Sequence, residues 1–546
     1  MEPAIKMKRR EFNQKLALAG GFLAFRPISA LAQNLQNLAG GNAQTPASQA
    51  ATSIARGTIR NAQTGEGMAK IRVSNGRDVV QTDRLGRYEI ALQDGDVLFV
   101  VKPRGFDFER NALQKPQFFR VHRPGGSPKQ QFAGIAPTGD LPRAIDFRLT
   151  PQKENDEFRV LLFGDPQSRN QSEVDFLTRD IIEPLVGVDA AFGVSLGDIA
   201  FDDLTIYANQ NAAIGQIGLP WHNVLGNHDL NFDAPDRELS AETYKAIFGP
   251  TYYSFDYGPA HFVVLDDVAY DGLASAPAGR NKGTYHTELG EKQLAWLRSD
   301  LALVPKNQLV VFLMHIPMVA LEGEEKHTMR DLPQFLDLIS DRPHTLSISA
   351  HTHFQTHKFI GRERGFNGAN PHHHFNCVTT CGSWWRGALD ARGIPHTAMR
   401  DGAPNGYAFL NVNKNAYTLD FRAAGADESH QMDIVLPLEA KAGENLEILA
   451  NVWNGSEKSK VEVRVNELPW RAMEQVQRPD PNYVACRAYE ESLPKTAGRK
   501  LPAPVDCTHL WAAQLGGLSA GTHTLTVRET DMWNRVHVSR KILRVA

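Results

Sequence analysis

Five short apolar segments in the middle of the chain each end in side chains that can bind a metal ion. The segments and the polar residues after them are VLLFG with Asp165, VSLG with Asp198, NVLG with Asn227 and His228, VVFLM with His315, and LSISA with His351 and His353. Carboxylate, amide and imidazole groups bind divalent metals. A lone Asp or Asn after a strand is usually a turn former. Five such strand ends in succession would rarely carry these residue types by accident. They predict a metal centre, because the carboxyl ends of strands in an α/β sheet meet at one rim.

The elements that must position these side chains alternate between strand-like and helix-like segments from about residue 157. Apolar runs such as FRVLLFGD and QLVVFLMH alternate with stretches such as SEVDFLTRDIIEPL and ELGEKQLAWLRSDLALV. In the last stretch Leu294, Leu297 and Leu301 recur at helical spacing on one face. Buried strands covered by helices indicate an α/β domain, which we assign to residues 153–427.

The segments on both sides of this domain have a different pattern. Residues 53–152 and 428–546 contain short stretches with period-two alternation, punctuated by Gly and Asp, which is typical of antiparallel β-domains. The first resembles the transthyretin-like modules that precede many secreted hydrolases, and the second is predicted to be a β-sandwich. A chain of 546 residues is expected to contain about two to four domains.

The order of the motifs resembles the calcineurin-like metallophosphoesterases, whose pattern runs D-x-H, G-D, G-N-H-D/E, H and G-H-x-H. Here it reads GDPQ, LGDIAFDD, LGNHD, MHIP and SAHTH between residues 164 and 353. The resemblance implies a central α/β/β/α sandwich flanked by β-sandwich domains, of a secreted bacterial type. Gln167 stands where many members have histidine, and its weaker carbonyl donor favours a looser site or Mn²⁺. Ala350 replaces the usual glycine, which is tolerated if φ there is negative.

The resemblance also implies two divalent metal ions (Mn²⁺, Fe²⁺ or Zn²⁺) that share Asp198. The first ion would be held by Asp165, Gln167, Asp198 and His353, and the second by Asp198, Asn227, His315 and His351. Such a pair polarises phosphoryl oxygens and makes hydroxide available near neutral pH. His228 is the candidate that protonates the leaving oxygen, and Asp229 is predicted to orient His228 by accepting its other N–H.

For several polar and aromatic residues near these motifs the sequence allows two interpretations, one functional and one structural. Adjacent tryptophans cannot both face the core of one strand, so either Trp384 or Trp385 contacts a substrate, with Arg386 pairing with phosphate, or the pair fills a domain interface. His222 is either a support for the metal ligands or a packed residue. The histidines at 372–374 are expected in a solvated loop, with a substrate contact as the alternative. Asp202 and Asp203 either tune the site or cap the next helix.

The first 52 residues have the composition of an export signal and a linker. Arg9 and Arg10 precede an apolar run from Leu16 to Phe25, and Ala30-Leu31-Ala32 follows as a small-residue cleavage site. We therefore predict a twin-arginine signal peptide at 1–32 and a linker at 33–52, and a periplasmic or secreted location. Ten apolar residues are too few to cross about 30 Å of hydrocarbon, and no other stretch reaches transmembrane length.

Export makes disulfides possible. Cys486 and Cys507 would close a modest loop, and a bridge there would add about 3 kcal/mol by limiting the unfolded chain. Cys377 and Cys381 would lie about 13 Å apart on an extended strand, beyond disulfide reach, so we expect them to be free and packed unless a turn intervenes.

These observations favour an exported dinuclear-metal enzyme that hydrolyses a phosphate diester or monoester. A composition of 42% hydrophobic and 22% charged residues is that of a soluble globular protein, and the net charge of −3 gives no basic footprint for nucleic acid. A nuclease of the same fold is one alternative, and a catalytically inactive periplasmic or surface binding protein is another. The natural substrate and the oligomeric state are not encoded in these motifs.

Overall fold

The computed structural model describes residues 52–320, 327–493 and 499–546. The predicted signal peptide at 1–32, and the linker at 33–52 apart from its last residue, lie outside the described residues. Within the described part, no helix combines the length and the apolar character needed to cross a membrane.

The N-terminal region consists of two four-stranded sheets, with strand orders β4-β1-β8-β6 and β3-β2-β5-β7. Side chains from both sheets share one apolar core, for example Ile59 of the first sheet and Leu98 of the second. The alternation of the sequence is visible in β1, where Ala55, Gly57 and Ile59 are buried and Ile54 is exposed. The strands are β1 (Ser53–Asn61), β2 (Arg72–Ser74), β3 (Val79–Gln81), β4 (Arg87–Leu92), β5 (Val97–Val100), β6 (Phe106–Phe108), β7 (Phe119–Val121) and β8 (Phe147–Pro151).

The first central sheet has the order β11-β10-β9-β20-β21. Its strands β9, β10 and β11 are parallel, β20 runs antiparallel to β9, and β21 runs antiparallel to β20 and so in the direction of β9. The strands are β9 (Glu157–Phe163), β10 (Phe192–Ser195), β11 (Trp221–Asn223), β20 (Gly406–Asn413) and β21 (Ala416–Ala423). Leu161 and Phe163 of β9 share a core with the helices, whereas Val160 and Leu162 belong to the larger core that contains the second central sheet. Both faces of the sheet are therefore covered.

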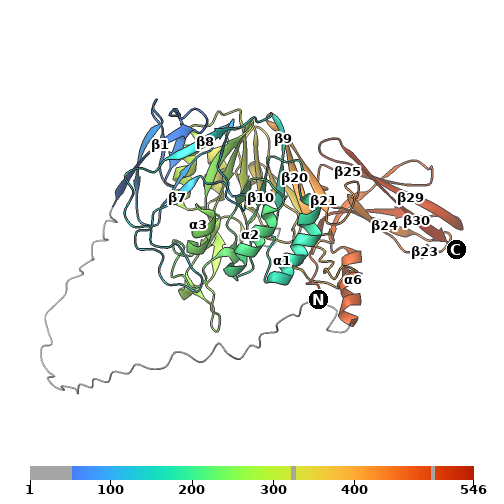
Figure 1. Ribbon diagram of the computed structural model, residues 1–546. Coiled ribbons are helices and arrows are strands. Elements are labelled where there is room, and N and C mark those ends of the chain that lie inside the picture. Colours follow the sequence, from blue (N-terminus) through green and yellow to red (C-terminus); the bar gives the residue numbers. More distant parts are fainter. Residues whose placement is uncertain (1–51, 321–326, 494–498) are drawn as a thin grey trace, which may run out of the picture. The chain divides into compact units, whose positions relative to one another are not determined.

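Helices α1 (Gln171–Leu177) and α2 (Tyr207–Gly215) pack against each other beside this sheet, as Figure 1 shows in green. The chain after α1 continues through a π-helical turn, η1 (Thr178–Ile182), and a 3-10 turn, η2 (Glu183–Leu185). Leu177, Ile181 and Ile214 contribute to the core shared with the sheet. Asn170 starts α1 by accepting the N–H of Glu173, which satisfies one of the free donors of the first turn.

The second central sheet has six strands in the order β12-β13-β16-β17-β19-β18. Its strands are β12 (Tyr253–Tyr257), β13 (Ala260–Val264), β16 (Leu309–Leu313), β17 (Thr345–Ser349), β18 (Thr356–Ile360) and β19 (His372–Asn376). Phe262 contacts Phe192 of the first sheet with ring centroids 5.1 Å apart. Phe312 contacts Phe335 of α5 (Leu332–Ile339) at 5.1 Å. The order from helices through two sheets to helices confirms the predicted α/β/β/α sandwich.

Helix α4 (Glu291–Leu301) covers the second sheet together with α5. Leu294, Leu297 and Leu301 are all buried, as their spacing predicts. Smaller elements complete the region: η3 (Leu204–Ile206), η4 (Asn227–Asp229), α3 (Glu242–Phe248), β14 (Val268–Tyr270), η5 (Leu273–Ser275), β15 (Tyr285–Thr287) and η7 (Arg362–Arg364).

A buried charge cluster joins the N-terminal region to the central sandwich. Arg72 of β2 donates to Asp256 at 2.6 Å and to Asp300 at 3.4 Å. The ring of His261 lies between the same two carboxylates, at 2.7 Å from Asp256 and 2.8 Å from Asp300. The side chains of His261 and Asp300 are fully buried. Removal of any one charged group would therefore leave a buried charge without compensation, which is destabilising.

The C-terminal region consists of two further sheets, with orders β22-β24-β28-β27 and β23-β30-β29-β25-β26. Ile448 and Trp511 of the first sheet share a core with Leu525 and Leu543 of the second, which confirms the predicted sandwich. The strands are β22 (Met432–Val435), β23 (Glu439–Ala440), β24 (Leu446–Val452), β25 (Lys460–Val465), β26 (Arg471–Ala472), β27 (Glu474–Arg478), β28 (Cys507–Leu515), β29 (Gly521–Thr530) and β30 (Val536–Val545). The boundaries assigned to the three domains stay predictions.

Helix α6 (Pro481–Ser492) interrupts this C-terminal β-region and was not predicted. Its start has a clear sequence signal, because Asp480 accepts the N–H of Tyr483 and Pro481 occupies the first helical position. Cys486 lies on this helix and is partly buried, whereas Cys507 is buried beside His509. Both thiols are free, so the bridge considered between them is not formed. Cys377 and Cys381 are free and buried, as expected.

Candidate metal centre

The predicted ligands all follow strands of the two central sheets and converge at one rim. Asp165 follows β9 and Asp198 follows β10, whereas His315 follows β16 and His351 follows β17. Each of the two sheets therefore contributes ligands to the same site. All seven predicted ligands are buried except His351, which is partly buried.

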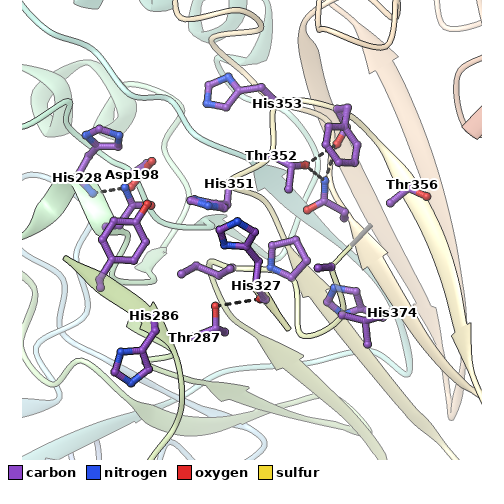
Figure 2. Close-up of a pocket in the computed structure, with 18 of the residues that line it drawn as sticks. Asp198, His228, His286, Thr287, His327, His351, Thr352, His353, Thr356 and His374 are labelled. Atoms are coloured by element: carbon purple, nitrogen blue, oxygen red, sulfur yellow. Dashed lines mark hydrogen bonds between the residues drawn. The ribbon is translucent and has the colours of Figure 1, made fainter. Parts of the chain in front are cut away.

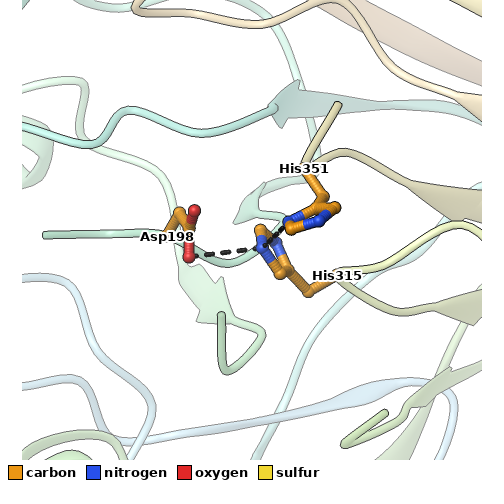
Figure 3. A group of neighbouring side chains, drawn as sticks. All are labelled: Asp198, His315 and His351. Atoms are coloured by element: carbon orange, nitrogen blue, oxygen red, sulfur yellow. Dashed lines mark hydrogen bonds and ion pairs between the residues drawn. The ribbon is translucent and has the colours of Figure 1, made fainter. Parts of the chain in front are cut away.

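Three of these ligands form the centre of the site, shown in Figure 3. The donor atoms of Asp198, His315 and His351 lie within 4.8 Å of one another. His315 Nε2 is 3.2 Å from Asp198 Oδ1 and 3.2 Å from His351 Nδ1. Asn227 Oδ1 is 3.0 Å from the same His315 nitrogen. A carboxylate, an amide oxygen and two imidazoles that point at one another form a donor set suited to a divalent metal.

Backbone carbonyls fix the orientation of two of the histidines. His315 Nδ1 donates to Leu196 O at 2.8 Å, and His353 Nδ1 donates to Gly382 O at 2.5 Å. When Nδ1 carries the proton, the lone pair of Nε2 is free to bind a metal. Both rings are therefore oriented with Nδ1 towards the backbone, which leaves Nε2 as the nitrogen that a metal would bind.

The first predicted set also surrounds Asp198. Gln167 Nε2 donates to Asp198 Oδ2 at 2.7 Å, so the amide nitrogen rather than the oxygen faces the carboxylate of Asp198. Cys381 Sγ lies 3.6 Å from Gln167 Oε1. Asp165 Oδ2 accepts the N–H of His351 at 2.8 Å, whereas Asp165 Oδ1 is buried and has no hydrogen-bond partner among the described residues. Burial raises the pKa of Asp165, the nearby His315 opposes this shift, and the charge of Asp198 adds to it. A metal ion would satisfy this oxygen and favour the ionised carboxylate.

Five of the seven predicted ligands have a left-handed backbone, which L-residues adopt rarely. The φ values are 41° at Asp165, 43° at Gln167, 46° at Asp198, 71° at His351 and 58° at His353. Each such residue costs on the order of 1–3 kcal/mol, and residues of this kind cluster at functional sites. Ala350 is absent from the positive-φ residues, so the replacement of glycine before the H-x-H motif creates no strain.

His228 has a different carboxylate partner from the one predicted. Its Nδ1 lies 2.6 Å from Asp202 Oδ1, and Lys282 binds the other oxygen of Asp202. The ring stacks on Phe201 at 4.2 Å, and the backbone N–H donates to Asp198 Oδ1 at 2.8 Å (Figure 2). Burial would lower the pKa of His228, but attraction to Asp198 and the bond to Asp202 outweigh it and raise the pKa.

Asp229 does not orient His228, so that prediction was wrong. Its carboxylate accepts the N–H groups of Ile199 at 3.1 Å, Ala200 at 3.0 Å and Gly226 at 2.9 Å. The hydroxyl of Tyr207 donates to it at 2.9 Å. These bonds hold the backbone directly after Asp198, so Asp229 shapes the loop that carries this predicted ligand. Asp203 caps η3, which agrees with the prediction that it caps the next helix.

A cavity of about 610 Å³ opens beside these ligands (Figure 2). Cationic, aromatic and apolar side chains share its wall. Beyond the ligands, they include Tyr285, His286, Ile316, Pro317, Val319, His327, Arg330, Phe354, Lys358, His374, Trp384 and Arg400. Sequence reasoning missed Arg330, Lys358 and Arg400, because they are single basic residues without a motif.

The paired tryptophans separate into two roles. Trp384 lines the cavity and stacks on His353 at 4.0 Å. Trp385 is buried, and its Nε1 donates to Pro166 O at 3.4 Å. Arg386 does not line the cavity, and its guanidinium lies 5.6 Å from the ring of Trp384. Trp384 is therefore the one tryptophan of the pair that is placed to contact a substrate, whereas Trp385 and Arg386, which were also predicted to do so, do not line the cavity.

Two other histidine predictions are corrected or resolved. Residues 372–374 form the start of the buried strand β19 and are not a solvated loop. Of these, His374 lines the cavity, with its ring nitrogens near Ser347 and Ser349. His222 is packed, with its ring stacked on Phe255 at 4.1 Å.

Three segments of the chain match known families. Residues 158–355 match the calcineurin-like phosphoesterases, residues 54–134 match the N terminal of calcineurin-like phosphoesterase, and residues 374–537 match the C terminal of calcineurin-like phosphoesterase. No curated protein matches the chain.

Three solved structures each resemble a small part of the chain. A superoxide reductase (neelaredoxin) from Ignicoccus hospitalis shares 12% identity over 21% of this chain and 81% of its own, with a TM-score of 0.14. A putative membrane anchored protein from Corynebacterium diphtheriae shares 18% identity over 25% of this chain and 28% of its own, with a TM-score of 0.14. A cohesin module from a Clostridium perfringens family 33 glycoside hydrolase shares 12% identity over 21% of this chain and 95% of its own, with a TM-score of 0.12.

Proposed function

The chain belongs to the calcineurin-like phosphoesterases, and we propose that it is an exported enzyme that hydrolyses phosphate esters with two divalent metal ions. The observation that carries this proposal is the convergence of Asp198, His315 and His351 from three strand ends in two sheets. Buried Asp165 supports it, because its Oδ1 has no hydrogen-bond partner among the described residues and its ion-pair contact with His315 Nδ1 is long, at 3.9 Å. Buried charges of this kind are rare unless they are paired or bind metals.

The residues present fit the two ligand sets, with Asp198 shared between them. Asp165, Gln167 and His353 would complete one set, whereas Asn227, His315 and His351 would complete the other. Two divalent ions in this place supply polarisation of the phosphoryl oxygens and a hydroxide nucleophile near neutral pH. The amide of Gln167 must present its oxygen for this role, which needs only a half-turn of the amide group.

His228 is the proposed proton donor to the leaving oxygen. It lines the cavity, and Asp202 holds its Nδ1–H, so its Nε2–H is the proton that can be transferred. The carboxylate of Asp202 also stabilises the charged imidazolium form. Lys282 holds Asp202 from its other side, which limits the rotation of the pair.

The wall of the cavity is suited to an ester with a bulky organic group. Trp384 and Tyr285 offer aromatic faces, and Arg330 and Lys358 offer cationic groups on the cavity wall. A cavity of about 610 Å³ falls in the range of small-molecule sites. A diester therefore fits this wall better than a small monoester.

Turnover of p-nitrophenyl phosphate and bis-p-nitrophenyl phosphate tests the proposal. Chelated protein should be inactive, and Mn²⁺, Fe²⁺ or Zn²⁺ should restore activity, with a preference for the diester. The Asp198→Asn variant is the control for contaminating hydrolases. Protein that binds no metal and shows no turnover would instead support a binding protein.

Export is tested separately with the N-terminal 52 residues fused to a reporter. Replacement of Arg9 and Arg10 by lysine should retain the reporter in the cytoplasm of a bacterial host, because the twin-arginine route requires the arginine pair. Unchanged export of the lysine variant would contradict this route.

A further inference from the structure

A second cluster of metal-binding side chains lies outside the candidate metal centre. His396 comes from the loop at 387–397, and Cys486 and Glu490 come from α6. The donor atoms of the three residues lie within 4.8 Å of one another. Cys486 Sγ is 3.5 Å from His396 Nε2, and the same nitrogen is hydrogen-bonded to Glu490 Oε1. None of these residues belongs to either predicted ligand set.

We propose that Cys486, His396 and Glu490 form a zinc site that fastens α6 to this loop. A thiolate, an imidazole and a carboxylate are ligands that zinc takes in proteins. Tetrahedral zinc with ordinary bond lengths places a sulfur and a nitrogen ligand about 3.6 Å apart, which agrees with the 3.5 Å between Sγ and Nε2. Cys486 and Glu490 are four residues apart on one helix, so they share a face.

The charge balance of the cluster also favours a cation. The Glu490 side chain is only 6% exposed, and no lysine or arginine is paired with it among the described residues. A divalent ion would compensate the carboxylate and stabilise the thiolate. His396 is one-third exposed, at 33%, which leaves access for the ion and for a water as fourth ligand.

The site would brace the loop that presents Trp384 to the cavity. Glu490 Oε1 accepts the N–H of Ala388 at 2.7 Å, so α6 already contacts this loop. Thr397, next to His396, accepts the N–H of Ser383 at 3.2 Å and donates its own N–H to Arg386 O at 3.0 Å. These bonds enclose Trp384 between two fixed points. A metal at His396 would therefore limit the movement of the aromatic wall without touching the substrate.

Alkylation of the native protein tests the site without any substitution. Cys486 is the one cysteine that is not buried, so iodoacetamide should label it in chelated protein, with the position read by mass spectrometry. Zinc should slow this labelling by about ten-fold or more, because the bound thiolate is protected. Equal labelling rates with and without zinc would overturn the proposal.

Metal content and cobalt spectra provide a second test. Cys486→Ala should bind about one zinc per chain fewer than wild type, because a thiolate ligand is lost. Glu491→Gln is the matched control, since Glu491 pairs with Arg487 on the same helix and should leave the metal content unchanged. Cobalt-loaded protein should show a thiolate charge-transfer band that disappears in Cys486→Ala. A band that survives in this variant would belong to another thiol, such as Cys381, and would overturn the assignment.

This test does not depend on the proposed phosphoesterase activity. Asp198→Asn should retain the zinc bound at Cys486 even where it loses the ions of the candidate metal centre. Loss of all metal in Asp198→Asn, together with full metal retention in Cys486→Ala, would contradict the second site and leave the first intact.

Discussion

Replacement of Asp202 by asparagine should slow the hydrolysis of esters with poor leaving groups. Asp202 accepts a hydrogen bond from His228 Nδ1 at 2.6 Å and carries the negative charge that favours the imidazolium form. A hydrogen bond to a charged group contributes about 1.5–3 kcal/mol. Its loss in the transition state corresponds to a fall in kcat of about 10- to 100-fold, with KM little changed because His228 does not hold the ground-state phosphate.

The leaving group separates this role from a structural one. A p-nitrophenolate ion departs without a proton, so Asp202→Asn should affect p-nitrophenyl esters much less than alkyl esters. The matched control is Asp203→Asn. Asp203 caps η3, and the carboxylate paired with His228 among the described residues is that of Asp202 instead; asparagine caps helices as well as aspartate does. Steady-state kinetics on a nitrophenyl and an alkyl ester would measure both effects.

Two results would refute this reasoning. Equal losses on both esters would mean that Asp202 does not act through proton donation. An equal loss in Asp203→Asn would mean that the effect comes from the loop as a whole. Far-ultraviolet circular dichroism and metal content should match wild type in both variants.

Three further predictions concern the centre, the charge cluster and the tryptophans. Asp198→Asn should lose metal and turnover together, whereas His228→Ala should keep its metal and show a lower kcat on alkyl esters. Elemental analysis and steady-state kinetics measure the two effects. Equal metal loss in both variants would contradict the assigned roles. His261 has a raised pKa because its two aspartates outweigh the effect of burial. The contribution of this charged imidazole to stability is complete below about pH 6.5 and is lost as the pH rises through the raised pKa. The melting temperature of wild type should therefore fall more with rising pH than the melting temperature of His261→Gln. Trp385→Ala should cost about 3–5 kcal/mol of stability, whereas Trp384→Ala should mainly raise KM. Urea unfolding measures the first effect and steady-state kinetics the second. A large loss of stability in Trp384→Ala, with a raised KM in Trp385→Ala, would contradict their placement.

Much of the candidate centre was predictable because each ligand directly follows a buried strand. Asp165, Asp198, His315 and His351 could be identified from the apolar runs that precede them. The rule that ligands collect at the carboxyl ends of strands then brings them together without any knowledge of the sheets. The flanking β-domains were predictable for a similar reason, since period two is a local property of the sequence.

The partner of His228 was not predictable from local order. Asp229 is adjacent to His228 in the sequence, whereas Asp202 lies 26 positions earlier in another motif, and both are carboxylates. The left-handed backbone at Asp198 and the hydrogen bonds from Ile199 and Ala200 turn Asp229 towards the loop and leave Asp202 facing the imidazole. Backbone conformation of this kind depends on the surrounding packing, which no pattern of residue types reports.

The sequence by itself determined the type of each element and the chemistry at the strand ends, because periodicity and side-chain type are properties of neighbouring residues. Tertiary structure alone decided which of two tryptophans faces the cavity, that the histidines at 372–374 lie in a buried strand, and that His396 meets Cys486 and Glu490. These outcomes depend on contacts between residues about 90 positions apart in the case of His396 and α6. Such contacts are selected by the packing of whole elements, so they carry no local signature.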